Sequence, residues 1–284
     1  MQLSYVAVCG GSNLDVGGIP DAPLITRDSN PGHVIVSAGG VGRNIAAGIA
    51  RLDVPVTLLT ALGADSAAGS VRGGSPGVDF SHALILPDMA TSTYLYLADE
   101  TGDMVLALSD MEIMSALTPA YFERHLDVLN AASVVVLDAN LPEESLRYLA
   151  DHVTAPLFAD PVSTKKAMKL LPLLDKLHTL KPNRLEAEVL TGCSDPEEAV
   201  QALLRAGVKQ VFLSMGSSGV CCGSGAHVTR IPVHHLPTAN TTGAGDAFTA
   251  ALTVAHVKGL DLEASTRFAM DCVLQKLQME VLSQ

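Results

Sequence analysis

The segment Asn240-Thr241-Thr242-Gly243-Ala244-Gly245-Asp246 places glycines and a carboxylate directly before an apolar, helix-like run over residues 247–257. Glycine lets backbone N–H groups approach a ligand closely. The N-terminus of a helix presents N–H donors that attract phosphate. A carboxylate beside such an anion hole suits a base that takes the proton from a hydroxyl group. An ordinary helix start, with Asp246 in its first turn, fits the same residues.

A second glycine-rich segment, Gly39-Gly40-Val41-Gly42-Arg43-Asn44, follows a β-branched run over residues 34–37. Its spacing is neither that of a dinucleotide-binding loop nor that of a P-loop, which ends in Gly-Lys-Ser/Thr. The glycines could bring the backbone against a polyhydroxy ligand, with Asn44 donating and accepting hydrogen bonds. A tight turn before a packed helix is the alternative.

Other polar residues suit hydroxyl or metal binding. Asn13 and Asp15 follow the first expected strand, and Asp15 could accept hydrogen bonds from vicinal hydroxyls or lie in a turn. Asn183 and Glu186 are three residues apart, so they share a helix face and offer oxygen ligands of the kind that Mg²⁺ prefers. The same two residues also form a capping-box pattern.

Short β-branched runs and helical patterns alternate along the chain, which favours βαβ units. The expected strands cover residues 5–9, 34–37, 56–61, 133–137, 157–159, 178–180 and 210–214, and the expected helices cover 43–52, 142–150 and 197–206. Several strands end in polar residues or glycine, which is where open α/β sheets bind ligands. Residues 14–37 and 83–108 are rich in β patterns without helices, and we expect them to form a small extra sheet.

Composition excludes several classes of protein. The 284 residues carry a net charge of −12, and no basic run stands out, so nucleic acid is not an expected partner. The five cysteines are odd in number and include no C-x-x-C pair, which indicates a reduced, cytoplasmic protein rather than a disulfide framework. No signal peptide or membrane-length apolar run is present, so no membrane partner is expected.

Taken together and in this order, the motifs resemble the ribokinase-like (PfkB) family of sugar and nucleoside kinases. Two glycine-rich signatures about 200 residues apart, with Asn183-x-x-Glu186 between them, are far more specific than any one of them. The resemblance implies one α/β domain over residues 1–284. It would be a three-layer sandwich with a nine- or ten-stranded, mostly parallel sheet and a small β lid from residues 14–37 and 83–108. The family often dimerises through this lid.

The resemblance also implies roles for individual residues. Asp246 would be the catalytic base, and the N–H groups of Gly243, Ala244 and Gly245 would form the anion hole. ATP and Mg²⁺ would be required, with Asn183 and Glu186 holding metal-bound waters. The acceptor would be bound by Asn13, Asp15, Ser29, Asn30, Gly40, Gly42, Asn44 and Thr93, and the nucleotide by Asn183, Ser214, Gly216, Gly219, Thr242, Gly243 and Gly245.

Within the family, the chain is most similar to members that phosphorylate the 5′-hydroxyl of pseudouridine. The segments that carry this similarity are Asp28-Ser29-Asn30-Pro31-Gly32, Ser109-Asp110-Met111-Glu112-Ile113 and Leu180-Lys181-Pro182-Asn183-Arg184-Leu185-Glu186. Many members carry an aspartate at the position of Asn240 that helps to hold a monovalent cation, so a strong K⁺ requirement is not expected. A kinase for ribose, another sugar or another nucleoside is the alternative, and a non-catalytic nucleotide- or sugar-binding protein is an alternative of another class.

The chain departs from the family pattern at two places. The helix between Asp65 and Gly77 is shortened around Gly73-Gly74-Ser75-Pro76. After Met270, a terminal helix is expected where the family continues with a loop that lines the adenine pocket.

Overall fold

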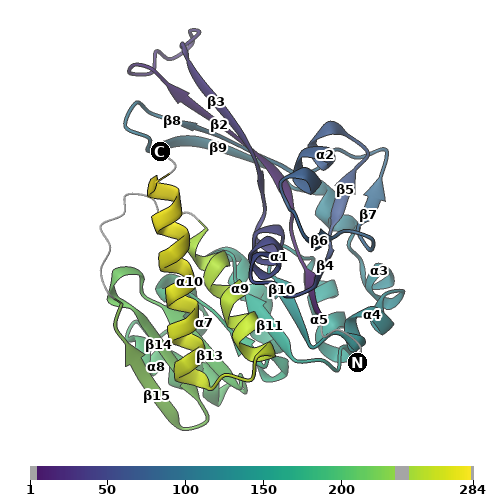
Figure 1. Cartoon of the computed structure of the whole chain (residues 1–284), viewed down its shortest axis with the longest axis vertical. Coiled ribbons are helices and arrows are strands. Elements are labelled where there is room, and N and C mark those ends of the chain that lie inside the picture. Colours follow the sequence, from purple (N-terminus) through teal and green to yellow (C-terminus); the bar gives the residue numbers. More distant parts are fainter. Residues whose placement is uncertain (1–4, 234–242, 283–284) are drawn as a thin grey trace.

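A nine-stranded sheet forms the centre of the computed structural model, which describes residues 5–233 and 243–282 (Figure 1). The strand order is β15-β14-β13-β12-β11-β10-β1-β4-β6. The parallel strands are β1 (Val6–Cys9), β4 (Val56–Leu59), β6 (Val78–Asp79), β10 (Val134–Asp138), β11 (Leu157–Asp160), β12 (Thr179–Leu180) and β13 (Gln210–Ser214). Strands β14 (Val220–Ser224) and β15 (His227–Ile231) add an antiparallel edge. The expected mostly parallel sheet is confirmed.

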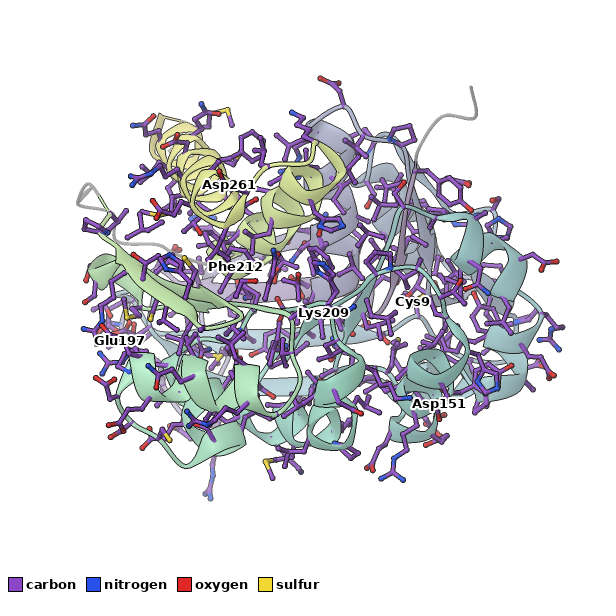
Figure 2. All side chains as sticks on the ribbon, turned by 90° about the horizontal axis from the view of Figure 1, so that it is seen from below. Cys9, Asp151, Glu197, Lys209, Phe212 and Asp261 are labelled. Atoms are coloured by element: carbon purple, nitrogen blue, oxygen red, sulfur yellow. The ribbon has the colours of Figure 1, made fainter. Side chains whose placement is uncertain are left out.

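Alternate residues of each strand pack against helices on opposite faces of this sheet. In β1, Val6 and Val8 face one apolar cluster, whereas Ala7 and Cys9 face the other. The first face is covered by α1 (Val41–Arg51), α9 (Ala244–Val257) and α10 (Leu262–Leu282). The second is covered by α3 (Pro119–Glu123), α4 (Leu126–Ala131), α5 (Glu143–His152), α7 (Arg184–Thr191) and α8 (Pro196–Arg205). Figure 2 shows the yellow helices on one side of the strands and the teal and green helices on the other.

A separate four-stranded sheet projects from the main body and forms the lid (Figure 1). Its order is β3-β2-β8-β9, with strands β2 (Asn13–Pro20), β3 (Gly32–Gly39), β8 (Thr93–Ala98) and β9 (Met104–Asp110). Strands β2 and β8 are parallel and the other two pairs are antiparallel, so the sheet is mixed. Within the second β-rich stretch, β7 (Leu84–Leu86) pairs with β5 (Ala61–Gly63) outside the lid.

Helix α2 (Ser66–Gly73) is short, and Asp65 caps it by accepting a hydrogen bond from the backbone N–H of Ala68 at 2.8 Å. The terminal helix α10 packs its apolar residues against α9. All five cysteines are free thiols. In the described part of the chain, no helix combines the length and the apolar character needed to cross a bilayer.

Candidate active site

Asp246 lies in the first turn of α9, where Asn44 of α1 fixes its carboxylate. The side-chain amide of Asn44 donates to Oδ2 of Asp246 at 2.7 Å, across 202 residues of sequence. Burial, together with the negative charge of Asp160, raises the pKa of Asp246 to about 6, although Asn44 and Lys181 oppose the shift. A carboxylate with a pKa near neutrality is a suitable general base.

The backbone at the start of α9 is arranged to receive an anion. Gly243 precedes the helix with φ of 70°, a left-handed conformation that glycine adopts without strain. The first N–H groups of a helix have no partner within it, and α9 has 14 residues that contribute to its dipole. A Cβ atom on Gly243 would lie 2.7 Å from Nζ of Lys276, and one on Gly245 would lie 3.1 Å from Nζ of Lys181. Two ammonium groups therefore border this helix start.

Lys181 and Asp160 form a buried ion pair at the ends of neighbouring strands. Their Nζ and Oδ2 atoms are 3.0 Å apart, and the two side chains are 7% and 5% exposed. The hydroxyl of Thr249, one turn into α9, donates to the same Oδ2 at 2.8 Å. Burial lowers the pKa of Lys181, but the carboxylates of Asp160, Glu186 and Asp246 raise it more, so the amine stays charged.

A second buried carboxylate joins the loops that would surround an acceptor. Asp138, at the end of β10, accepts hydrogen bonds from the backbone N–H groups of Gly11 at 2.8 Å and Gly42 at 2.7 Å. Gly40 and Gly42 thereby lie beside the glycines that follow β1. Because these loops meet at glycines, no side chain stands between their backbones where they approach each other before Asn44.

Asn13 and Asp15 complete this region from the base of the lid. The amide of Asn13 donates to Oδ1 of Asp15 at 2.5 Å. Burial raises the pKa of Asp15, which Asn13 and the positive charge of Arg43 partly offset. Arg43 in turn holds the end of β3, since its guanidinium group donates to the backbone oxygens of Ala38 and Gly39. The structure therefore brings Asn13, Asp15, Gly40, Gly42, Asn44 and Asp246 into one connected network.

Asn183 and Glu186 occupy a different part of the sheet edge, at the start of α7. They form the capping box: Asn183 N–H donates to Oε2 of Glu186 at 2.8 Å, and Glu186 N–H donates to Oδ1 of Asn183 at 2.9 Å. Burial raises the pKa of Glu186, while Asn183 and Lys181 lower it. The backbone of Asn183 also forms an isolated parallel β-bridge with Ser214 at the end of β13. Gly216 and Gly219 flank the next turn, whereas Thr242 and Asn240 lie outside the described residues.

This arrangement fits Mg²⁺ held through water. Glu186 offers a buried carboxylate, but that carboxylate and the amide oxygen of Asn183 already accept backbone hydrogen bonds. Within residues 5–233 and 243–282, no three His, Cys, Asp or Glu side chains converge on one point. Mg²⁺ in kinases keeps several waters and binds mainly to substrate phosphates, so it needs few direct protein ligands.

Three residues were predicted to bind the acceptor, Ser29, Asn30 and Thr93, but in the described part of the chain their side chains form no hydrogen bond to the residues around Asp246. Ser29 and Asn30 belong to the exposed connection between β2 and β3, which projects away from the main sheet (Figure 1). There Asn30 stabilises the turn by accepting from Ile25 N–H at 2.7 Å. Thr93 pairs with Leu14, and because successive strand residues alternate between faces, it lies on the lid face opposite to Asp15.

The lid face shared with Asp15 carries two tyrosines that the sequence analysis did not single out. Tyr94 pairs with Asp15, and Tyr96 pairs with Gly17. The ring of Tyr96 occupies the space that a side chain at position 17 would need. The two rings lie 6.2 Å apart between centroids. Aromatic residues placed two apart in a strand are a signal for such a surface, since they share one face.

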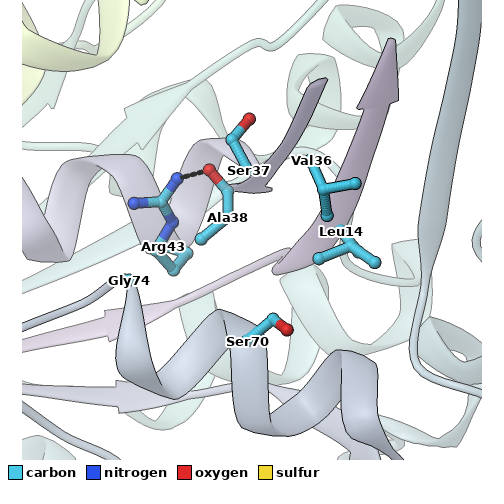
Figure 3. Close-up of a pocket in the computed structure, with 7 residues that line it drawn as sticks. All are labelled: Leu14, Val36, Ser37, Ala38, Arg43, Ser70 and Gly74. Atoms are coloured by element: carbon cyan, nitrogen blue, oxygen red, sulfur yellow. Dashed lines mark hydrogen bonds between the residues drawn. The ribbon is translucent and has the colours of Figure 1, made fainter. Parts of the chain in front are cut away.

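The opposite face of the lid root borders a cavity of about 410 Å³ (Figure 3). Leu14 and Val36 from the lid lie on one side of it, and Ser70 of α2 lies on another. Figure 3 also shows the hydrogen bond from Arg43 to Ala38, both of which line the cavity.

Comparison with known proteins assigns the class. Residues 4–278 match the model of the pfkB family of carbohydrate kinases. The chain is 39% identical to pseudouridine kinase of Escherichia coli K12, over 98% of this chain and 92% of that protein. A putative sugar kinase structure from Clostridium perfringens has a TM-score of 0.85 at 33% identity, covering 96% of this chain and 90% of that one. Arabidopsis thaliana ribokinase, solved with ribose and ATP, has a TM-score of 0.80 at 25% identity, covering 98% and 93%.

The fold and the site thus define a phosphotransferase with an alcohol acceptor. The chain belongs to the pfkB family of carbohydrate kinases, and its ribokinase-like fold is shared along nearly its whole length with these relatives.

Proposed function

We propose that this kinase transfers the γ-phosphoryl group of ATP to the 5′-hydroxyl of pseudouridine. The observation that supports the chemistry is the position of Asp246, held by Asn44 beside the N-terminus of α9. The identity of 39% to a pseudouridine kinase, over 98% of the chain, supports the acceptor. Asn13, Asp15 and Asn44 would bind the ribose hydroxyls, next to the backbone of Gly40 and Gly42.

In this proposal each residue has a defined task. Asp246 takes the proton from the 5′-hydroxyl as its oxygen attacks phosphorus. The N–H groups of Gly243, Ala244 and Gly245 stabilise the negative charge of the transferred group, which is the main demand of phosphoryl transfer. When Mg²⁺ is bound it neutralises charge on the phosphate oxygens. Its waters would be held by Asn183 and Glu186. The nucleotide would lie beside Ser214, Gly216 and Gly219.

The deciding experiment is a comparison of acceptors with ATP and Mg²⁺. Initial rates with pseudouridine, uridine, adenosine and ribose give kcat/KM for each. A preference for pseudouridine of at least about tenfold, which corresponds to about 1.4 kcal/mol, is the expected result. Uridine used equally well would overturn the substrate assignment. A preference for ribose would leave a family kinase of different specificity, and no turnover of any acceptor would favour a non-catalytic binding protein.

Tyr94 provides a test of how the base is held. It pairs with Asp15 and so shares the lid face of a residue proposed to bind the ribose, and we expect the base attached to that ribose to lie against its ring. Tyr94→Ala should raise KM for the nucleoside about tenfold, because base–aromatic stacking contributes about 1–3 kcal/mol. Thr93→Ala, a change on the opposite lid face, is the matched control and should leave KM unchanged. Equal KM values for the nucleoside in both variants would contradict the stacking role.

We also propose that two copies associate through the lid. Pairing places Val34, Val36, Leu95, Leu106 and Leu108 on one face of the lid sheet. Each of these side chains is exposed, with values between 43% for Leu95 and 71% for Val34. Contiguous apolar surface of this kind marks an interaction site, and a second copy would bring the same apolar face.

Association through the lid predicts that the double variant Val36→Asp/Leu108→Asp is a monomer, because each charge would have to be buried in the interface. Light scattering coupled to size exclusion measures the mass directly. Leu260→Asp changes an apolar residue of similar type in the turn after α9 and should leave the mass at twice 29.5 kDa. A wild-type protein that is monomeric at micromolar concentration would contradict the proposal.

A further inference from the structure

Lys166 lies in the short helix α6 (Thr164–Ala167), directly after β11. Its ammonium group donates to Oδ1 of Asn140 at 2.5 Å. Asn140 lies two residues beyond the end of β10, so both side chains belong to the carboxyl edge of the main sheet. This is the edge that carries Asp138, Asp160 and Lys181.

The neighbouring lysine has a different environment. Lys169 donates to the backbone oxygens of Ala139 at 3.0 Å and Leu141 at 2.8 Å, so it stabilises the turn after β10. Burial and the charge of Lys166 lower the pKa of Lys169. Lys166, by contrast, has one amide oxygen as its partner. Among the residues that the structure describes, no carboxylate oxygen lies within 4.0 Å of its ammonium group. Lys166 is partly buried, and one neutral amide oxygen leaves its ammonium group able to donate further hydrogen bonds to an anion.

A continuous series of contacts links Lys166 to the loops around the acceptor. The amide of Asn140 lies against Gly11, since a Cβ atom there would be 3.0 Å from Nδ2. The backbone oxygen of Gly11 accepts from Arg43 N–H at 3.0 Å. Asn44, the next residue, holds Asp246. Lys166 is thus connected through Asn140 to the Gly11 loop, which contacts the residue before Asn44.

We propose that Lys166 binds the phosphoryl group as it reaches the acceptor oxygen, and that Asn140 is the positioning residue that aims the ammonium group. This rests on the function proposed above. In that reaction the bond between the acceptor oxygen and phosphorus forms, the bond from phosphorus to the β–γ bridging oxygen breaks, and the hydroxyl proton goes to Asp246. Lys166 exchanges no proton. It supplies a fixed positive charge, which is most effective where the transferred group carries its negative charge outside water.

The central variant is Lys166→Met, which keeps the length of the side chain and removes its charge. We expect kcat to fall by about 10²–10³-fold, as for loss of one donor to a developing charge, with KM for the nucleoside within about twofold. Lys166→Arg should recover part of the rate, because the charge is retained. Lys165→Met, an exposed neighbour in the same helix, is the matched control and should behave as wild type. A wild-type kcat in Lys166→Met would overturn the proposal, as would an equal loss in Lys165→Met.

A second readout does not depend on turnover. Acetic anhydride labels lysine amines, and mass spectrometry compares labelling of Lys166 and Lys165 in the same peptide. The 5′-phosphate of the best acceptor should protect Lys166 several-fold and leave Lys165 unprotected, whereas the nucleoside alone should protect neither. Absence of protection by the phosphate, and also by ATP with Mg²⁺, would overturn the role of Lys166. Failure of the pseudouridine assignment would look different, because the preferred acceptor would change while the lysine effects persisted.

Discussion

Asp246→Asn should lower kcat by about 10²–10⁴-fold, the contribution of a general base to proton transfer. The substitution keeps the size of the side chain, and its amide oxygen can still accept the hydrogen bond from Asn44. It removes the ability to take the proton from the acceptor hydroxyl. Steady-state rates at saturating ATP and nucleoside measure the effect. Near-normal kcat in this variant would eliminate Asp246 as the base.

The pH dependence of the wild type follows from the same carboxylate. Because burial raises its pKa to about 6, kcat/KM should increase as pH rises through about 6 and be level above it. In Asp246→Asn, kcat/KM should not show this increase with pH. The folded protein also holds the proton of Asp246 more tightly than the unfolded chain, whose carboxyl has a pKa near 3.8. Ionisation therefore costs stability as pH rises from about 4 to about 6, so the Asn variant should be no less stable than wild type at pH 8.

Lys181→Met should cause the largest loss of stability, about 3–5 kcal/mol in the free energy of unfolding. The variant leaves the buried carboxylate of Asp160 without its cation, and breaking a buried pair from one side is strongly destabilising. Urea unfolding followed by circular dichroism measures the change. Loss of the positive charge should also move the acidic limb of any remaining activity to higher pH, since Lys181 lowers the pKa of Asp246.

The control for Lys181 is the double variant Lys181→Met/Asp160→Asn, in which the unpaired charge is also removed. It should regain part of the lost stability, and the difference between single and double variants isolates the charge from the packing. Equal stability of Lys181→Met and wild type would show that the pair is not buried in solution.

The sequence predicted best what is encoded locally. Helix α9 is preceded by Gly243 and carries Asp246 in its first turn, and both features are visible in a few consecutive residues. The capping box of Asn183 and Glu186 depends on a spacing of three and was found as an alternative to metal binding. Alternation of strands and helices predicted βαβ units, and the family resemblance predicted the mostly parallel sheet that the structure has.

What the sequence did not reveal depends on register and on contacts between distant segments. Whether Thr93 or Tyr94 shares the lid face of Asp15 depends on the pairing of β8 with β2, and a shift of one residue exchanges the two faces. The polar residues around Ser29 and Asn30 predict a binding loop, but the side chains of Asp28 and Asn30 form hydrogen bonds within the turn. The hydrogen bond from Thr249 to Asp160 forms only when α9 docks, because the two residues are 89 positions apart.

The carboxylate of Asp138 ties the final form of the glycine loops to folding of a strand made much later in the chain. Its two backbone partners, Gly11 and Gly42, precede it by 127 and 96 residues. Closing such long loops is slow, because the loss of chain entropy comes before the favourable contacts with the distant strand form. A nascent chain that has made β1, β2 and α1 but not yet β10 therefore lacks the glycine loops in their final form. Protection of the Gly11 and Gly42 amides from hydrogen exchange should therefore not appear before β10 has been made and has paired with β1.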